Sequence, residues 1–189
     1  MPIAKTAHID ESLRVRHGLY LLAAVIVADA DAHSHRQALT ALLLRHQARL
    51  HWRDEGSMRR EQLTDAICEL RYTGIIVIAT GMTSARQERA RRKCIERLVI
   101  ELARRGIANA VFERRHDELD AGDRTLITAL RRQHSIPPSF RATWNPAVSE
   151  PLLWLADIAA GAASLAETGD DAYWRNLAAA FSVDRFAVD

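Results

Sequence analysis

The sequence Ala7-His8-Ile9-Asp10-Glu11-Ser12 joins a short apolar run, which begins at Ile3, to two adjacent carboxylates and a hydroxyl. A longer run, GLYLLAAVIVA at residues 18–28, follows almost at once and contains no charged side chain. Its β-branched residues and its boundaries at Gly18 and Asp29 predict a buried strand. If the first run is the neighbouring strand, Asp10 lies at its end, where a buried carboxylate costs free energy unless it is paired or binds a cation. The alternative is that residues 10–12 begin a solvated hairpin turn.

The composition predicts one globular domain over residues 1–189. Hydrophobic residues make up 48% and charged residues 26% of the chain, which are ordinary values for such a domain. No apolar run approaches the roughly 18 residues that span a bilayer, and Asp10 and Glu11 interrupt any signal-peptide pattern. Cys68 and Cys94 lack metal-ligand spacing and are interpreted as small buried side chains in a reducing compartment. A cytoplasmic protein without membrane contact is expected.

The basic residues are almost all arginine, since only two of the 26 lysines and arginines are lysine. Arginine offers planar, permanently charged donors that suit phosphate, so the composition permits RNA or DNA as a partner without requiring it. The predicted nucleic-acid contacts lie on a basic helix, residues 84–105, and in the turn after the fourth strand: Arg86, Arg89, Arg92, Arg97 and Arg115. The alternative is a solvated helix face whose arginines pair with neighbouring glutamates.

Apolar runs and amphipathic patterns alternate along the rest of the chain. They predict strands at residues 3–10, 18–28, 73–80, 108–113 and 139–144, and helices at residues 31–47, 57–70, 84–105, 120–133, 150–163 and 172–181. Strands that are apolar on both faces and are separated by helices are typical of a sheet covered on both sides. The predicted fold class is therefore α/β, with a mixed sheet of about five strands flanked by α-helices.

Three acids occupy unusual places in this arrangement. Asp10 and Glu113 each end a predicted strand, and Asp157 interrupts a helix that is otherwise apolar nearly all round. For Asp157 alone, pairing with an arginine such as Arg141 or capping of a nearby backbone would explain the charge. For all three, binding of Mg²⁺ or Mn²⁺ is the more economical hypothesis, because acidic oxygens are the ligands these ions prefer. Two such ions can activate water and stabilise the leaving oxygen in phosphodiester cleavage.

Two segments carry a resemblance to a known family. The Asp10-Glu11-Ser12 segment and the run Glu150-Pro-Leu-Leu-Trp-Leu-Ala-Asp-Ile-Ala-Ala-Gly-Ala162 resemble the bacterial family called domain of unknown function 3800, a branch of the ribonuclease H-like superfamily. The turn Glu113-Arg114-Arg115, followed by Asp123, is also similar. The resemblance implies a ribonuclease H-like fold over most of the chain. It further implies Asp10, Glu113 and Asp157 as catalytic metal ligands, with Asp123 or Glu11 as a fourth.

The sequence departs from the family pattern at one position. Many relatives carry a glutamate two residues before a histidine in the segment that matches Leu50-His51, and this chain has Arg49 there. His51 is interpreted as a proton shuttle or substrate contact, or as a loop histidine packed beside Trp52. No glycine-rich phosphate loop, Cys/His cluster or Gly-x-Ser-x-Gly motif occurs.

The predicted function is a divalent-metal-dependent nuclease that acts on RNA or DNA. The alternative is a catalytically inactive ribonuclease H-like module that binds nucleic acid or protein, as part of a toxin or defence system. The sequence leaves the oligomeric state open, with a homodimer as one option.

Overall fold

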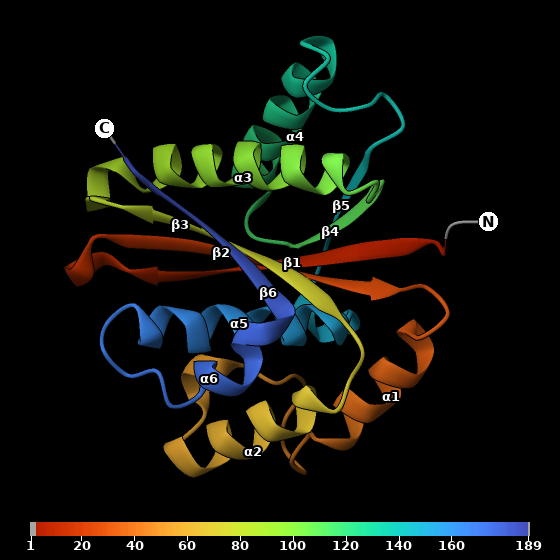
Figure 1. Ribbon diagram of the computed structural model, residues 1–189, viewed down its shortest axis with the longest axis vertical. Helices are drawn as coiled ribbons and strands as arrows, with labels where there is room; N and C mark the ends of the chain where they lie inside the picture. The colour runs from red at the N-terminus through yellow and green to blue at the C-terminus, as the bar shows by residue number, and fades with distance from the viewer. Residues whose placement is uncertain (1–2, 189) are drawn as a thin grey trace.

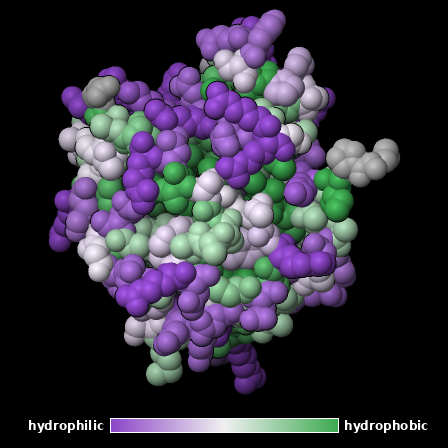
Figure 2. Space-filling view, in the orientation of Figure 1, coloured by the Kyte–Doolittle hydropathy of each residue, from purple (hydrophilic) through white to green (hydrophobic). Residues whose placement is uncertain are grey.

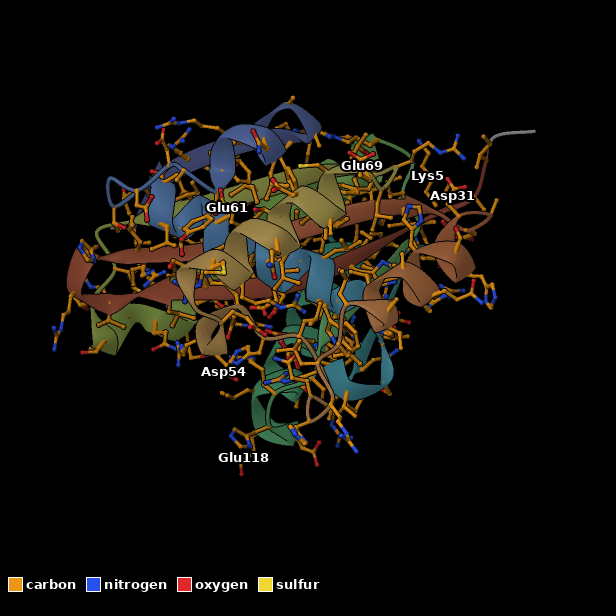
Figure 3. All side chains as sticks on the ribbon, turned by 90° about the horizontal axis from the view of Figure 1, so that it is seen from below. Lys5, Asp31, Asp54, Glu61, Glu69 and Glu118 are labelled. Carbon is orange, nitrogen blue, oxygen red and sulfur yellow. The ribbon has the colours of Figure 1, made fainter. Side chains whose placement is uncertain are left out.

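The two N-terminal apolar runs form a long antiparallel hairpin at the centre of the sheet. Strand β1 (Lys5–Arg14) pairs with β2 (Leu19–Ala28) over its whole length, with Lys5 opposite Ala28 and Arg14 opposite Leu19. Lys5 and the residue Asp31 just beyond β2 therefore lie together at one end of the molecule (Figure 3). The predicted end of β1 at Asp10 is wrong, as is the alternative of a hairpin turn there, because pairing with β2 carries the strand four residues further.

The computed structural model describes residues 3–188, and their sheet has six strands in the order β5-β4-β1-β2-β3-β6. The remaining strands are β3 (Thr73–Thr80), β4 (Asn109–Glu113), β5 (Arg141–Asn145) and β6 (Phe181–Ala187). β3 runs antiparallel to β2, whereas β4 runs parallel to β1 and to β5, and β6 runs parallel to β3. The prediction of an α/β fold with a mixed sheet is confirmed.

Helices cover both faces of the sheet, with α3 and α4 on one side and α1, α2, α5 and α6 on the other (Figure 1). Their bounds are α1 (Ala32–Ala41), α2 (Ser57–Cys68), α3 (Gln87–Arg104), α4 (Asp117–Arg132), α5 (Leu152–Ala166) and α6 (Trp174–Leu177). Short 3₁₀ segments are η1 (Val15–His17), η2 (Trp52–Asp54), η3 (Ser84–Arg86), η4 (Ala147–Ser149) and η5 (Ala178–Ala180).

The strands divide their apolar side chains between two hydrophobic cores, because successive residues of a strand point to opposite faces. Tyr20 and Leu22 of β2 pack in the core below α3, whereas Leu21 and Ala23 pack in the core against α5. For the same reason, the side chains of Asp10 and Glu11 point to opposite faces of the sheet. Because Ile9 lies in the α3 core, the even-numbered Asp10 is directed towards α5.

The predicted C-terminal helix at residues 172–181 is shorter in the structure, and a sixth strand follows it. Helix α6 ends at Leu177, and β6 extends the sheet along the outer edge of β3. Aromatic contacts hold the start of β6, where Phe181 lies 5.3 Å from Trp174 and 6.0 Å from Tyr72 between ring centroids. Burial of the Phe181 ring against the helical layer thus accompanies the change from helix to strand.

The exterior is largely hydrophilic on the face seen in Figure 2, with smaller hydrophobic areas between the polar side chains. Within residues 3–188, no helix is both long and apolar enough to cross a membrane. Cys94 is buried as predicted, but Cys68 is exposed, which corrects its interpretation as a core residue. The reason is its place at the end of α2, one residue beyond the buried Ile67.

Candidate functional site

A polar cavity of about 310 Å³ lies beside the second half of β1. β4 pairs with β1 only between Thr6 and Ile9, so among the strands of residues 3–188 the later part of β1 has a neighbour on one edge alone. The cavity lies beside the part of β1 that follows Ile9, where β4 no longer pairs with it. Its walls come from β1, the end of β4, the segment around η2, and α5.

The three acids singled out in the sequence line this one cavity, although they come from distant parts of the chain. Asp10 is directed there by its even-numbered place in β1, and Glu113 is the last residue of β4. Asp157 lies in the second turn of α5, where it is the one residue between Leu152 and Ser164 that is not fully buried. The sheet and α5 therefore bring the three carboxylates together.

Burial and neighbouring charges raise the pKa values of Asp10 and Asp157. Burial raises the pKa of Asp10 well above its usual value, and the charges of Asp157 and Glu113, together with a hydrogen bond to Glu113, raise it further. The backbone N–H of Glu11, which donates to Asp10 Oδ1 at 2.7 Å, opposes this rise. Burial raises the pKa of Asp157 to about 6, although a hydrogen bond from the Trp52 backbone opposes the shift. The cavity thus holds carboxylates that repel one another.

Two of the acids also have partners within the protein. Arg49 Nη1 donates to Glu113 Oε1 at 2.7 Å, so the residue that departs from the family pattern is ion-paired with a predicted ligand. The Trp52 backbone N–H donates to Asp157 Oδ2 at 2.7 Å, which is the backbone-capping role considered for Asp157. Arg141, the other partner considered, donates instead to the carbonyl of Pro138.

The two acids considered as a fourth ligand belong to a different cluster, centred on the buried Arg91. Arg91 Nη2 lies 2.7 Å from Asp123 Oδ2, and Arg91 Nη1 pairs with Glu11, which also accepts a hydrogen bond from the hydroxyl of Tyr20. Glu11 lines the cavity, whereas Asp123 does not. The arrangement ties β1, α3 and α4 together and leaves Asp123 separated from the three acids.

His51 lines the cavity near its outer edge. Its Nδ1 lies 2.9 Å from Oδ2 of Asp54, whose side chain is 71% exposed. Figure 3 shows Asp54 at the outer surface beside the start of α2. His51 can therefore contact both solvent and a molecule in the cavity.

The predicted nucleic-acid contacts divide between the cavity and the outer surface. Arg115 lines the cavity, but Arg86, Arg89, Arg92 and Arg97 of the basic helix do not. Arg97 Nη1 lies 3.0 Å from Asp184 Oδ2 of β6, whereas Arg105 Nε lies 2.9 Å from Glu101 Oε1 of the same helix, which is the glutamate pairing that the alternative describes. The cavity is instead lined by arginines that sequence reasoning missed: Arg14, Arg53, Arg60, Arg91 and Arg114. For Arg14, the available signal was its even-numbered spacing from Asp10.

Close packing of Gly161 against Trp52 fixes the floor of the cavity. A Cβ atom at Gly161 would lie 2.1 Å from Cδ1 of the Trp52 ring. We expect Gly161→Ala to displace Trp52, whose backbone N–H holds Asp157, and to lower the free energy of unfolding by about 1–3 kcal/mol. Urea unfolding measures this change.

Gly122 provides the matched control, since no atom lies within 4 Å of a Cβ built there and the residue is exposed in the interior of α4. Gly122→Ala is expected to stabilise the protein by about 0.5–1 kcal/mol, through the lower backbone entropy of the unfolded chain. Equal effects of the two substitutions would contradict the packing role of Gly161.

The architecture is of the ribonuclease H-like class. Among solved structures, a chain of the PCNA:RNase HII complex from Archaeoglobus fulgidus is similar, with a TM-score of 0.51 and 17% sequence identity, over 86% of this chain and 73% of that chain. This similarity shows the fold. No family model and no curated protein matches the sequence, so membership of the domain of unknown function 3800 family stays a prediction.

The residues present fit a divalent cation in their chemistry, although not in their present placement. Within residues 3–188, no group of three or more His, Cys, Asp or Glu side chains is arranged to hold a metal ion. Arg49 and the Trp52 N–H engage one oxygen each of Glu113 and Asp157. However, Asp10 and Glu113 are close enough to share a hydrogen bond, and oxygens of this kind are what Mg²⁺ and Mn²⁺ prefer.

Proposed function

We propose that the protein is a divalent-metal-dependent nuclease that hydrolyses phosphodiester bonds in RNA or DNA. The observation that carries this proposal is the meeting of Asp10, Glu113 and Asp157 in one cavity that arginines also line. Carboxylates suit a cation and arginines suit a phosphate, so the two kinds of side chain together match a metal-bound phosphodiester. One similar solved structure is that of a protein named RNase HII in complex with PCNA, and its name fits the same class of substrate.

Each group has a role in this proposal. Asp10, Glu113 and Asp157 would hold Mg²⁺ or Mn²⁺, which when bound would activate a water molecule and stabilise the leaving oxygen. Arg115 would orient the phosphate through its guanidinium donors. His51, held by Asp54, stands where it can exchange a proton between the cavity and solvent.

The test is cleavage of end-labelled single-stranded RNA, single-stranded DNA and an RNA–DNA hybrid, with Mg²⁺, Mn²⁺ or EDTA. We expect cleavage with either metal and none in EDTA. Asp10→Asn is expected to reduce the rate by more than the 10- to 100-fold typical of changes around a metal's outer shell, because it removes a direct ligand. Absence of cleavage of all three substrates with both metals would refute the proposal.

A second candidate function is a module of the same fold that binds nucleic acid or protein without turnover, in a toxin or defence system. The ion pair between Arg49 and Glu113 favours it, because a guanidinium then neutralises a carboxylate that a metal would need. In this alternative the guanidinium of Arg49 neutralises Glu113 in place of a metal ion.

Arg49→Gln separates the two candidates. Without the guanidinium, Glu113 is free to bind a cation, and we expect affinity for Mn²⁺ to rise about tenfold, or about 1.4 kcal/mol. The increase in melting temperature that Mn²⁺ produces should rise accordingly, since a ligand of the native state stabilises it by mass action. Arg45→Gln is the control, because Arg45 is exposed and does not line the cavity. Failure of Mn²⁺ to stabilise either the parent or Arg49→Gln would favour the binding module.

A further inference from the structure

A second group of arginines lines the same cavity, apart from those that pair with acids. We infer that Arg14, Arg53 and Arg60 form a binding site for a backbone phosphate of a nucleic-acid strand, beside the carboxylates. This inference rests on the proposed function only in taking nucleic acid as the ligand, since binding at these arginines requires neither metal nor cleavage.

The three arginines come from separate elements that meet at the cavity. Arg14 ends β1, Arg53 lies in η2, and Arg60 lies in the first turn of α2. Among residues 3–188, none of the three lies within ion-pair distance of a carboxylate. The cavity's other arginines all have such partners, in Glu11 or Asp123 for Arg91, Asp117 for Arg114, and Glu88 for Arg115.

Two of the three side chains are held in place by neutral acceptors, which leaves charged donors unused. Arg14 Nε donates to Ser164 Oγ at 3.2 Å. Arg60 Nε and Nη2 both donate to the Trp52 carbonyl at 3.1 Å, and the guanidinium lies 4.9 Å from the centroid of the Trp52 ring. Within residues 3–188, the Nη groups of Arg14 and Nη1 of Arg60 donate no hydrogen bond, so they are available to a ligand. Fixed guanidinium donors lose little conformational entropy when they bind an anion.

The charges of the three side chains act on one another. Burial lowers the pKa of Arg14, and the positive charges of Arg60 and Arg53 lower it further. An anion between them would relieve this repulsion. A phosphate matches the forked guanidinium donors, which can bind its oxygens in pairs. The nearby Asp10, Glu113 and Asp157 would repel an anion that brings no metal, so the phosphate at the arginines is a neighbour of the one that is cleaved.

The backbone of η2 links the two parts of the site. The Trp52 N–H donates to Asp157, while the Trp52 carbonyl accepts from Arg60. The backbone of Trp52 thus positions both the side chain of Asp157, a predicted metal ligand, and that of Arg60, a proposed phosphate-binding residue. A strand held at the arginines would therefore be placed at a fixed distance from the carboxylates, which is what positioning for an in-line attack requires.

The test measures binding in EDTA, where no cleavage can take place. Fluorescence anisotropy with labelled oligothymidylate and oligouridylate, over a series of salt concentrations, gives the slope of log K against log salt. For the triple variant Arg14→Gln, Arg53→Gln and Arg60→Gln, we expect this slope to fall by about 0.7, which is the contribution of one single-strand phosphate contact. Arg45→Gln, Arg104→Gln and Arg132→Gln remove the same charge from exposed positions outside the cavity and should leave the slope nearly unchanged.

A single substitution at an exposed arginine tests the same inference in case the triple variant does not fold. Arg53 is exposed, so Arg53→Glu should fold normally, and it should weaken oligonucleotide binding more than Arg16→Glu, a charge reversal at an exposed position outside the cavity. Equal loss of slope in the two triple variants would overturn the inference. Complete displacement of the oligonucleotide by inorganic phosphate at equal phosphate concentration would also overturn it, because the site would then take free phosphate.

The outcomes for the two proposals are separable. Cleavage by the parent combined with unchanged binding by the cavity triple variant would refute the phosphate site alone. Loss of binding by that variant, with no cleavage by the parent under any metal, would refute the nuclease alone.

Discussion

Asp157→Asn is expected to abolish metal-dependent cleavage while making the metal-free protein more stable. The substitution removes a negative charge from a cavity that Asp10 and Glu113 share, at nearly constant shape. An asparagine retains a side-chain oxygen that can accept the Trp52 N–H, so the contact that now fixes Asp157 can persist. Opposite changes in activity and stability at one residue are typical of a site whose strain serves function.

The raised pKa of Asp157 determines the pH range in which Asp157→Asn stabilises the protein. The pKa of Asp157 is raised from 3.8 to about 6 by burial. Between these values the native protein binds more protons than the unfolded chain, so the free energy of unfolding falls as pH rises through this window. At neutral pH this loss of unfolding free energy is nearly complete and amounts to about 3 kcal/mol. Asp157→Asn should recover about this amount at neutral pH and little below pH 4, where both states of the parent are protonated.

Urea unfolding in EDTA at acidic and neutral pH, alongside cleavage assays with Mg²⁺ and Mn²⁺, measures both effects. Asp65→Asn is the control, because Asp65 is exposed and remote from the cavity, and it should change neither quantity. Cleavage that survives in Asp157→Asn would show that another protein causes it or that Asp157 is not required. A loss of stability at neutral pH would mean that the charged hydrogen bond to Trp52 outweighs repulsion.

The sheet could be predicted largely from apolar runs, because β2 and β3 are buried on both faces and so contain almost no polar residue. β6 could not be predicted in this way. It is an edge strand with several exposed positions, and it follows a run of alanines that favours a helix. Its pairing with β3 is set by tertiary contacts such as that between Phe181 and Tyr72, which no local pattern displays.

The acids of the site could be predicted from the sequence, because burial of a carboxylate in an apolar segment costs free energy and therefore indicates a partner or a bound cation. Asp10, Glu113 and Asp157 share that property, and the fold places them together. Arginines carry no comparable signal, since their long side chains occur throughout this chain. The partners of Arg49 and Arg14 lie far away in sequence, at Glu113 and Ser164, and only the fold brings them together.

Asp123→Ala is expected to destabilise the fold strongly, in contrast to Asp157→Asn. The side chains of Asp123 and Arg91 are only 3% and 4% exposed, and Arg91 donates to Asp123 from both Nε and Nη2. Removal of Asp123 leaves a buried cation with Glu11 as its remaining close carboxylate partner. Breaking a buried pair in this way costs about 3–5 kcal/mol, because the desolvation of the other charge is no longer offset.

Urea unfolding measures this loss, and an exposed pair provides the comparison. Asp184→Ala breaks the ion pair with Arg97, whose side chains are 45% and 47% exposed, and should cost no more than about 1 kcal/mol. Replacing both partners, as in Arg91→Met with Asp123→Leu, should recover part of the stability lost in Asp123→Ala, since no unpaired charge then remains. If Asp123→Ala instead retains full stability and loses Mn²⁺ binding, Asp123 is a metal ligand, as the family resemblance implies, and its ion pair with Arg91 must open when the metal binds.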